Sequence, residues 1–164
     1  MTEDKTTIKI LSRINEFNDL SHYCEGVNQG IITTGDKIFM LQGEINGEVF
    51  TLGEVRITPL NIIHGKLEIL GYKLNNCAYI TDCSGIPNET KRQLKNLDIL
   101  ILNALGFDPH PTHFSLNQSL DAVAELKPKR AIFTHINHKF DHATVMAKLP
   151  KGVELAYDGM TIEC

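Results

Sequence analysis

The amino-acid sequence predicts a mixed α/β fold, and three observations support this prediction. Residues 37–61 contain short runs of β-forming residues separated by turn residues, which is typical of antiparallel strands. Residues 97–102 (LDILIL) are apolar apart from one aspartate, as in a strand that is buried on both faces. From residue 88 onward, strand-like and helical segments alternate as they do in βαβ units. The class is therefore α/β with a β-rich first half.

In the first half we expect a helix over residues 4–20, because apolar residues recur there at helical spacing. Short strands are expected over 37–42, 49–52 and 55–61. Asn46-Gly47 is a dipeptide favoured in tight hairpin turns. It predicts that residues 38–41 and 49–52 pair as antiparallel strands.

The middle of the chain predicts a strand pair over 69–74 and 77–80, joined by Asn75-Asn76, a dipeptide that tolerates positive φ. Asn88 is expected to cap a helix that ends near residue 95. Ser115 and Gln118 have the spacing of a capping box, so a helix should begin there and end before Pro128.

The last third predicts a strand over 131–134 and a helix over 141–149. Two short strands over 154–157 and 160–163 are expected to close the chain as a hairpin, because Asp158-Gly159 between them favours a tight turn.

The length, charge and cysteine content of the chain narrow the classes of protein to which it could belong. The 164 residues have the size of one domain, so we expect a single domain over 1–164. The net charge of −4 offers no basic stripe for phosphates, which argues against a general nucleic-acid-binding protein. No apolar run reaches membrane-spanning length, and the polar N-terminus does not read as a signal peptide. Four widely spaced cysteines without a C-x-x-C pair predict reduced thiols and a cytoplasmic protein.

Three potential metal ligands stand where predicted strands end. His64 follows the strand that begins at residue 55, Asp82 follows 77–80, and His135 follows 131–134. Loops at strand ends carry much of the chemistry of α/β proteins, and imidazole and carboxylate are ligands for divalent metals. The three positions together suggest a metal centre.

Each of these residues also has a plain structural interpretation. His64 could be a turn histidine bonded to a backbone carbonyl, and Asp82 could be a turn former that accepts amides of Ser84 or Gly85. Cys83 is expected to pack beneath the site and not to act as a nucleophile, because nothing near it in sequence would lower its pKa. The pair His135 and His138 is by itself weak evidence for a metal.

Six sequence blocks in fixed order resemble the metallo-β-lactamase superfamily, in the branch that includes the cyclic phosphate phosphodiesterase of phosphonate breakdown. They are HGKLEILGY (64–72), AYITDCSGIP (78–87), LDILILNAL (97–105), HPTHFSL (110–116), IFTHINH (132–138) and GVELAYDGMTIE (152–163). The resemblance implies an αββα fold, present here mainly as the C-terminal half of the sandwich. It therefore implies a partial domain.

The resemblance also implies roles for four residues. His64 matches a ligand of a first metal, Asp82 the carboxylate that bridges two metals, and His135 a ligand of the second. His113 matches a histidine near the leaving group, a general acid. The implied cofactor is zinc or manganese, dinuclear in the intact family, and the implied substrate is a small phosphoester.

Two departures from the family pattern matter. The His-x-His-x-Asp-His loop that supplies two ligands to each metal is absent from the sequence, where the only histidine before His64 is His22. Asn103 stands where relatives usually carry aspartate after the buried strand, which removes a charge near the site.

These departures leave two expectations for function. One is a metal-dependent, phosphodiesterase-type hydrolase that is truncated and impaired on its own. The other is a non-catalytic remnant or half-domain binding module. Loss of the first sheet would expose apolar residues of the second, including Leu100, Leu102 and Ile132, so self-association or a missing N-terminal segment is expected.

Overall fold

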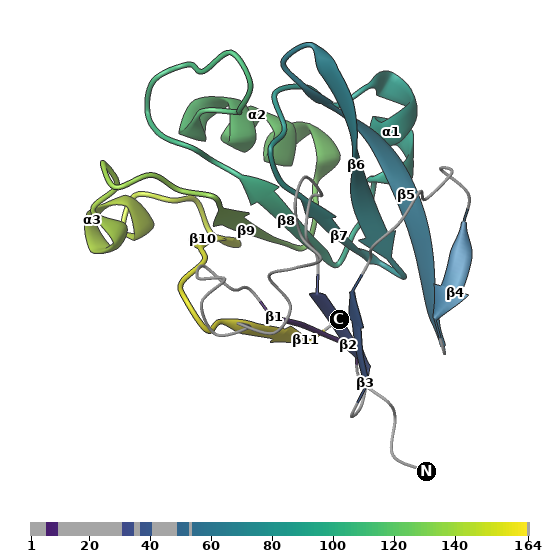
Figure 1. Cartoon of the computed structure of the whole chain (residues 1–164). Coiled ribbons are helices and arrows are strands. Elements are labelled where there is room, and N and C mark those ends of the chain that lie inside the picture. Colours follow the sequence, from purple (N-terminus) through teal and green to yellow (C-terminus); the bar gives the residue numbers. More distant parts are fainter. Residues whose placement is uncertain (1–5, 10–30, 35–36, 41–48, 53, 164) are drawn as a thin grey trace, which may run out of the picture. The chain divides into compact units, whose positions relative to one another are not determined.

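The computed structural model describes residues 6–9, 31–34, 37–40, 49–52 and 54–163. The chain divides into two compact units, one made of residues 1–46 and 156–164 and the other of residues 47–155. Each unit contains one sheet, and Figure 1 shows the elements of both. The expected single domain over 1–164 stays a prediction.

The larger unit is built on a seven-stranded mixed sheet with the order β10-β9-β8-β7-β6-β5-β4. Neighbours from β4 to β7 pair antiparallel, and those from β7 to β10 pair parallel. This arrangement confirms the α/β class with a β-rich beginning. The strands are β4 (Phe50–Leu52), β5 (Val55–His64), β6 (Leu67–Leu74), β7 (Cys77–Ile80), β8 (Ile99–Asn103), β9 (Arg130–Thr134) and β10 (Val153–Leu155).

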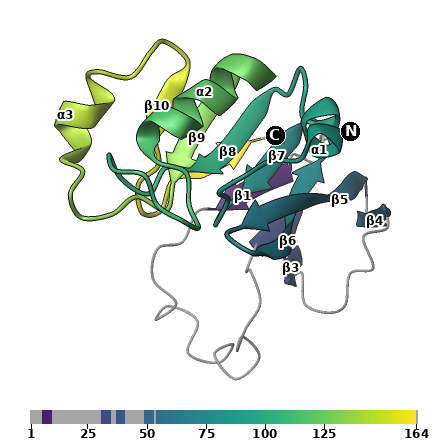
Figure 2. The ribbon, with the colours of Figure 1, turned by 90° about the horizontal axis from the view of Figure 1, so that it is seen from above.

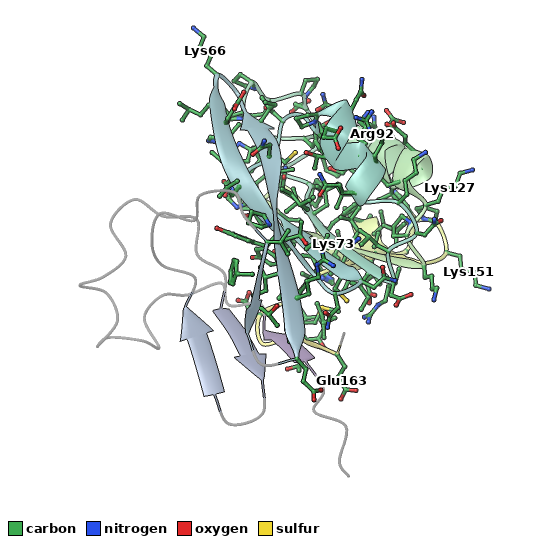
Figure 3. The ribbon with its side chains drawn as sticks, turned by 90° about the vertical axis from the view of Figure 1, so that its right-hand side faces the viewer. Lys66, Lys73, Arg92, Lys127, Lys151 and Glu163 are labelled. Atoms are coloured by element: carbon green, nitrogen blue, oxygen red, sulfur yellow. The ribbon has the colours of Figure 1, made fainter. Side chains whose placement is uncertain are left out.

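The hairpin of β6 and β7 confirms the turn predicted at Asn75-Asn76. Leu74 pairs with Cys77, and Asn75 has a φ of 49°, in the left-handed region that asparagine tolerates. The neighbouring hairpin of β5 and β6 pairs His64 with Leu67. The side chain of Lys66, at the tip of this hairpin, points away from the unit (Figure 3).

The core of this unit lies between one face of the sheet and the helices α1 (Asn88–Gln93) and α2 (Leu116–Leu126), which Figure 2 shows from above. Strand β8 is buried along its whole length, as its sequence predicts. Leu100 and Leu102 are fully buried beneath these helices, and Ile132 is also fully buried. The expected exposure of these three residues is therefore wrong, and self-association stays a prediction without that argument.

Helices α1 and α2 begin in different ways. Helix α2 has the predicted capping box, in which Ser115 accepts from the Gln118 backbone N–H and Gln118 accepts from the Ser115 N–H. Helix α1 begins after Pro87, and no side chain caps it. The prediction that Asn88 caps α1 is therefore wrong, because proline itself favours the extended conformation needed before a first turn.

The smaller unit contains a four-stranded antiparallel sheet with the order β11-β1-β2-β3. Its strands are β1 (Thr6–Lys9), β2 (Ile31–Thr34), β3 (Lys37–Met40) and β11 (Thr161–Glu163). The predicted helix over 4–20 is wrong at residues 6–9, because pairing with two neighbouring strands overrides the local helical pattern. Residues 10–20 of that prediction lie outside the described residues.

Two predicted hairpins are wrong. Strand β3 pairs with β2 in one sheet and β4 pairs with β5 in the other, so residues 38–40 do not pair with 49–52, and residue 41 lies outside the described residues. Strand β10 pairs in parallel with β9, whereas β11 pairs with β1, so the two closing strands belong to different sheets. The partners of β3 and β4 are their neighbouring strands in sequence, whereas the partners of β10 and β11 are distant in sequence, and turn propensity alone does not decide between such pairings. No helix in the described part of the chain is long and apolar enough to span a bilayer.

The cap of helix α3 (His142–Met146) leads to a prediction about acid stability. Asp141 accepts a hydrogen bond from the Thr144 backbone N–H at 2.8 Å, and hydrogen bonds from Thr144 hold the pKa of Asp141 below its ordinary value. Because the folded pKa is the lower one, the cap contributes fully above the unfolded pKa and is lost as pH falls through the folded pKa. We expect Asp141→Asn, which keeps an oxygen for the cap, to lose less stability than wild type between about pH 5 and pH 2.

Urea unfolding at each pH measures this difference. Asp121→Asn, an exposed carboxylate change on α2, is the matched control and should follow wild type. An identical pH dependence in Asp141→Asn and wild type would contradict the assignment.

Candidate metal centre

His64 is the last residue of β5, and its ring is fixed by two backbone carbonyls. Nδ1 lies 2.8 Å from the carbonyl oxygen of Asp82 and 3.0 Å from that of Thr112. Because carbonyl oxygens only accept hydrogen bonds, Nδ1 carries the proton and Nε2 carries the lone pair. Metal-binding histidines are commonly oriented in this way, with the second ring nitrogen donating to a carbonyl.

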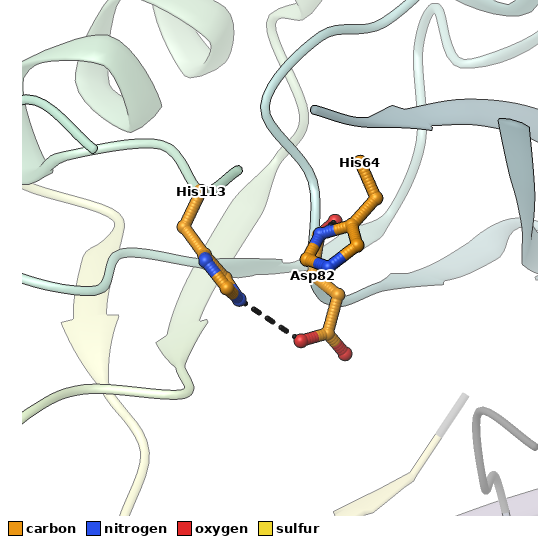
Figure 4. Close-up of side chains that lie close together, drawn as sticks. All are labelled: His64, Asp82 and His113. Atoms are coloured by element: carbon orange, nitrogen blue, oxygen red, sulfur yellow. Dashed lines mark hydrogen bonds and ion pairs between the residues drawn. The ribbon is translucent and has the colours of Figure 1, made fainter. Parts of the chain in front are cut away.

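Asp82 follows β7 and has a φ of 55°, which is unusual for a residue with a side chain. Its Oδ1 lies 3.0 Å from Nε2 of His113, as Figure 4 shows, and 3.6 Å from Nε2 of His135. The amide of Ser84 donates to the Ile63 carbonyl. Thus the Ser84 amide does not cap Asp82, and the carboxylate faces imidazoles instead.

His113 lies in the connection between β8 and α2, at the centre of the histidine group. Its ring meets that of His64 edge-on at 5.0 Å between centroids and stacks on that of His135 at 4.9 Å. Burial holds the pKa of His113 below its ordinary value, and the hydrogen bond to Asp82 opposes this shift. Neutral imidazole is the form of histidine that binds metals.

His135 follows β9 and, like Asp82, has a positive φ, of 54°. Its loop is fastened to the loop of His113, because the Asn137 backbone N–H donates to the Leu105 carbonyl at 2.9 Å. Gly106 permits this contact, since a Cβ there would lie 2.6 Å from Nδ2 of Asn137. Pairing of β8 with β9 thus extends into the two loops and brings His113 beside His135.

Sequence reasoning missed the part played by Thr112. Its carbonyl accepts from His64, and its hydroxyl lies 2.8 Å from Nδ1 of His113. His110, which the sequence analysis gave no role, has its Nδ1 3.2 Å from the same His113 nitrogen. The carbonyl contact has no sequence signal, because any residue type supplies a carbonyl.

The donors of this group fit a divalent metal ion. The ligand atoms of His64, Asp82 and His113 all lie within 4.8 Å of one another, and each side chain is partly buried. His135 adds a further imidazole on the same carboxylate oxygen. Imidazole nitrogen and carboxylate oxygen suit zinc and related ions, and the fixed Nδ1 proton of His64 leaves the other nitrogen available.

Cys83 lies next to this group but does not share its chemistry. The thiol is buried, and burial raises its pKa to about 12. Its Sγ lies 3.4 Å from the Gly85 carbonyl oxygen. The prediction that Cys83 packs beneath the site is confirmed by its burial, and its lack of a nucleophilic role stays a prediction.

Gly65 leads to a prediction about His64. It has a φ of 62°, and an added Cβ would lie 2.8 Å from Cγ2 of Thr112. We expect Gly65→Ala to cost about 1–2 kcal/mol of stability from the left-handed backbone alone. Displacement of Thr112 should also loosen the carbonyl that orients His64 and weaken metal binding. Thermal unfolding and calorimetric metal titration measure the two effects, with Gly159→Ala as a control that shares the positive φ but has open space around the added atom. A Gly65→Ala protein that binds metal as wild type does would contradict the second effect.

Comparisons with known proteins show the family and agree with the fold. The family model described as "Beta-lactamase superfamily domain" matches residues 7–136. A solved diphosphatase from the PhnP family has a TM-score of 0.72 and 40% sequence identity, covering 74% of this chain and 48% of that protein. Zn(2+)-bound PqqB from Methylobacterium extorquens has a TM-score of 0.57 at 18% identity, over 72% of this chain and 54% of its own, and so supports the fold alone.

A curated relative is the octanoyltransferase of Porphyromonas gingivalis (strain ATCC BAA-308 / W83), 31% identical over 113 residues. The match covers 68% of this chain and 23% of that protein. The chain thus spans about half the length of the PhnP-family structure and less than a quarter of the octanoyltransferase. Because the family model covers most of the chain and the diphosphatase shares 40% identity, the chain belongs to the metallo-β-lactamase superfamily, in its PhnP-like branch.

Proposed function

We propose that this chain provides part of the active site of a metal-dependent hydrolase of phosphoric esters, of the phosphodiesterase type. The observation that carries the proposal is the group of three imidazoles around the carboxylate of Asp82. The PhnP-family relative is a diphosphatase, which supports a phosphorus-containing substrate. The expected substrate is a small molecule.

His64, Asp82 and His135 are the proposed metal ligands. His64 presents Nε2 because its Nδ1 is held by carbonyls, and Asp82 presents the carboxylate oxygen nearest to the other imidazoles. A divalent ion held there, zinc or manganese, would polarise a phosphoryl oxygen and activate water for attack on phosphorus. The remaining chemistry falls to the chain's own residues.

His113 is the proposed proton donor to the leaving oxygen. A carboxylate only accepts hydrogen bonds, so the 3.0 Å contact with Asp82 requires a proton on Nε2 of His113. That proton faces the centre of the group, where a leaving oxygen would need it. Thr112 and His110 lie on the opposite ring nitrogen and hold the ring in this orientation.

A second candidate function is a phosphoester-binding half-site that does not turn over by itself. It is favoured by the number of donors, because the sequence lacks the His-x-His-x-Asp-His loop that would add two ligands to each metal of a dinuclear site. In this case the chain needs a further segment or a second copy to complete the centre. A reducing, cytoplasmic location is proposed with either function, because the four cysteines are widely spaced and contain no C-x-x-C pair.

Hydrolysis and metal content separate the two candidates. The chain is loaded with Mn²⁺ or Zn²⁺ and assayed with bis(p-nitrophenyl) phosphate and with a diphosphate diester. Metal-dependent turnover that is lost in His64→Ala and retained in the exposed control His142→Ala supports the hydrolase. Stoichiometric metal binding without turnover supports the half-site. A chain that binds neither metal with measurable affinity overturns both.

A further inference from the structure

Asn103 is the last residue of β8 and is completely buried, with 0% exposure. Its side-chain Oδ1 accepts a hydrogen bond from the Cys83 backbone N–H at 2.7 Å, and its Nδ2 donates to the Cys83 carbonyl at 3.1 Å. A buried amide with both ends bonded to one residue fixes that residue's backbone firmly. In this chain that residue directly follows Asp82.

The N–H that Asn103 binds belongs to the peptide between Asp82 and Cys83. The carbonyl of the same peptide accepts from Nδ1 of His64 at 2.8 Å. Asn103 and His64 therefore hold opposite sides of one peptide plane. Its orientation sets where the Asp82 carboxylate points and, together with the Thr112 carbonyl, which tautomer His64 adopts.

This peptide needs support, because Asp82 adopts a left-handed φ of 55°. Such a backbone costs about 1–2 kcal/mol in a residue with a side chain and persists only where neighbouring groups enforce it. The Cys83 carbonyl has a second donor, the Phe114 backbone N–H at 2.6 Å. The Cys83 N–H has Asn103 as its partner, so the acceptor oxygen of Asn103 is the contact that matters most.

Asn103 is itself rigidly placed. It pairs with Thr134 in the sheet, and its carbonyl accepts from the buried hydroxyl of Ser119 on α2 at 2.6 Å. A strand and a helix thus fix the position from which its side chain reaches the peptide.

We propose that Asn103 is a positioning residue, whose side-chain oxygen holds the Asp82–Cys83 peptide and thereby sets the geometry of Asp82 and His64 toward a divalent metal. The part of this inference that concerns the metal rests on the proposed function. The hydrogen bond between Asn103 and the Cys83 amide does not depend on that function. It also gives a reason for asparagine at this position: the amide holds the peptide without placing a buried charge there.

The test compares Asn103→Ala, which removes both hydrogen bonds to Cys83, with Asn103→Asp, which keeps the acceptor oxygen but loses the Nδ2 donor to the Cys83 carbonyl. Thr90→Ala is the matched control, because it deletes a buried hydrogen bond to the Asn61 carbonyl in the same unit, away from Asp82. Co²⁺ is titrated into each full-length protein, and its affinity and visible absorption spectrum are recorded. Protection of the Cys83 amide from hydrogen exchange is measured without metal.

We expect Asn103→Ala to lower Co²⁺ affinity by about 10- to 100-fold, to change the Co²⁺ spectrum and to expose the Cys83 amide to exchange. Asn103→Asp should keep Cys83 protected and stay within about tenfold of wild type. Thr90→Ala should lose stability but keep the wild-type Co²⁺ affinity and spectrum.

The proposal is overturned if Asn103→Ala matches wild type, or if Thr90→Ala loses as much Co²⁺ affinity. Should Asn103→Ala not fold, Asn103→Asp decides alone: loss of Cys83 protection or of Co²⁺ binding in that variant overturns the proposal. If wild type binds no Co²⁺, the proposed function fails, and Cys83 exchange still tests the role of Asn103.

Discussion

Asp82→Asn is expected to reduce divalent-metal affinity by about 100-fold or more and to abolish any metal-dependent hydrolysis. The Oδ1 of Asp82 is the atom on which the nearest nitrogens of His113 and His135 converge, at 3.0 and 3.6 Å. Asparagine keeps the size of the side chain but removes the negative charge that would balance a cation. Isothermal titration with Mn²⁺ and Zn²⁺ measures the affinity, and metal analysis after dialysis measures retention.

The control for this change is Asp121→Asn, which removes the same charge from the exposed surface of α2. It should bind metal as wild type does. Equal metal affinity in Asp82→Asn and wild type would remove Asp82 from the site. Equal losses in both variants would show that net charge, and not the position of the carboxylate, decides binding.

His113→Gln is expected to separate metal binding from proton donation. If His113 is the proton donor, the variant keeps metal affinity within about tenfold while kcat falls by about 10² to 10⁴. Substrates with poor leaving groups should lose more than the p-nitrophenyl ester, because a good leaving group needs little protonation. Parallel metal titration and steady-state kinetics on both substrate types make the measurement.

Because the ligand atoms of His113, His64 and Asp82 lie within 4.8 Å of one another, the same experiment also tests His113 as a ligand. A loss of metal affinity comparable to that of His64→Ala, with no dependence on the leaving group, would reassign His113 from donor to ligand. His142→Gln, an exposed change at the start of α3, should leave both quantities at wild-type values.

Local pattern was sufficient for several elements whose partners are close in sequence or whose burial is uniform, although it assigned β3 and β4 to each other and not to their actual neighbours β2 and β5. The run over 97–102 predicted the buried strand β8, Asn75-Asn76 predicted a hairpin, and Ser115 with Gln118 predicted the start of α2. Each depends on contacts within a few residues or on continuous apolarity. The predictions failed for β1, β10 and β11, whose partners are distant in sequence, because turn and helix propensities carry no information about such pairing.

The site divides in the same way. The sequence by itself determined that His64, Asp82 and His135 lie at or just after the ends of strands. The order of the sequence motifs pointed to the family that the family model shows. Only the tertiary structure placed His113 and His135 against the carboxylate of Asp82, because their loops meet through the parallel pairing of β8 and β9. It also gave Asn103 a partner, since a hydrogen bond between residues twenty positions apart leaves no local pattern in the sequence.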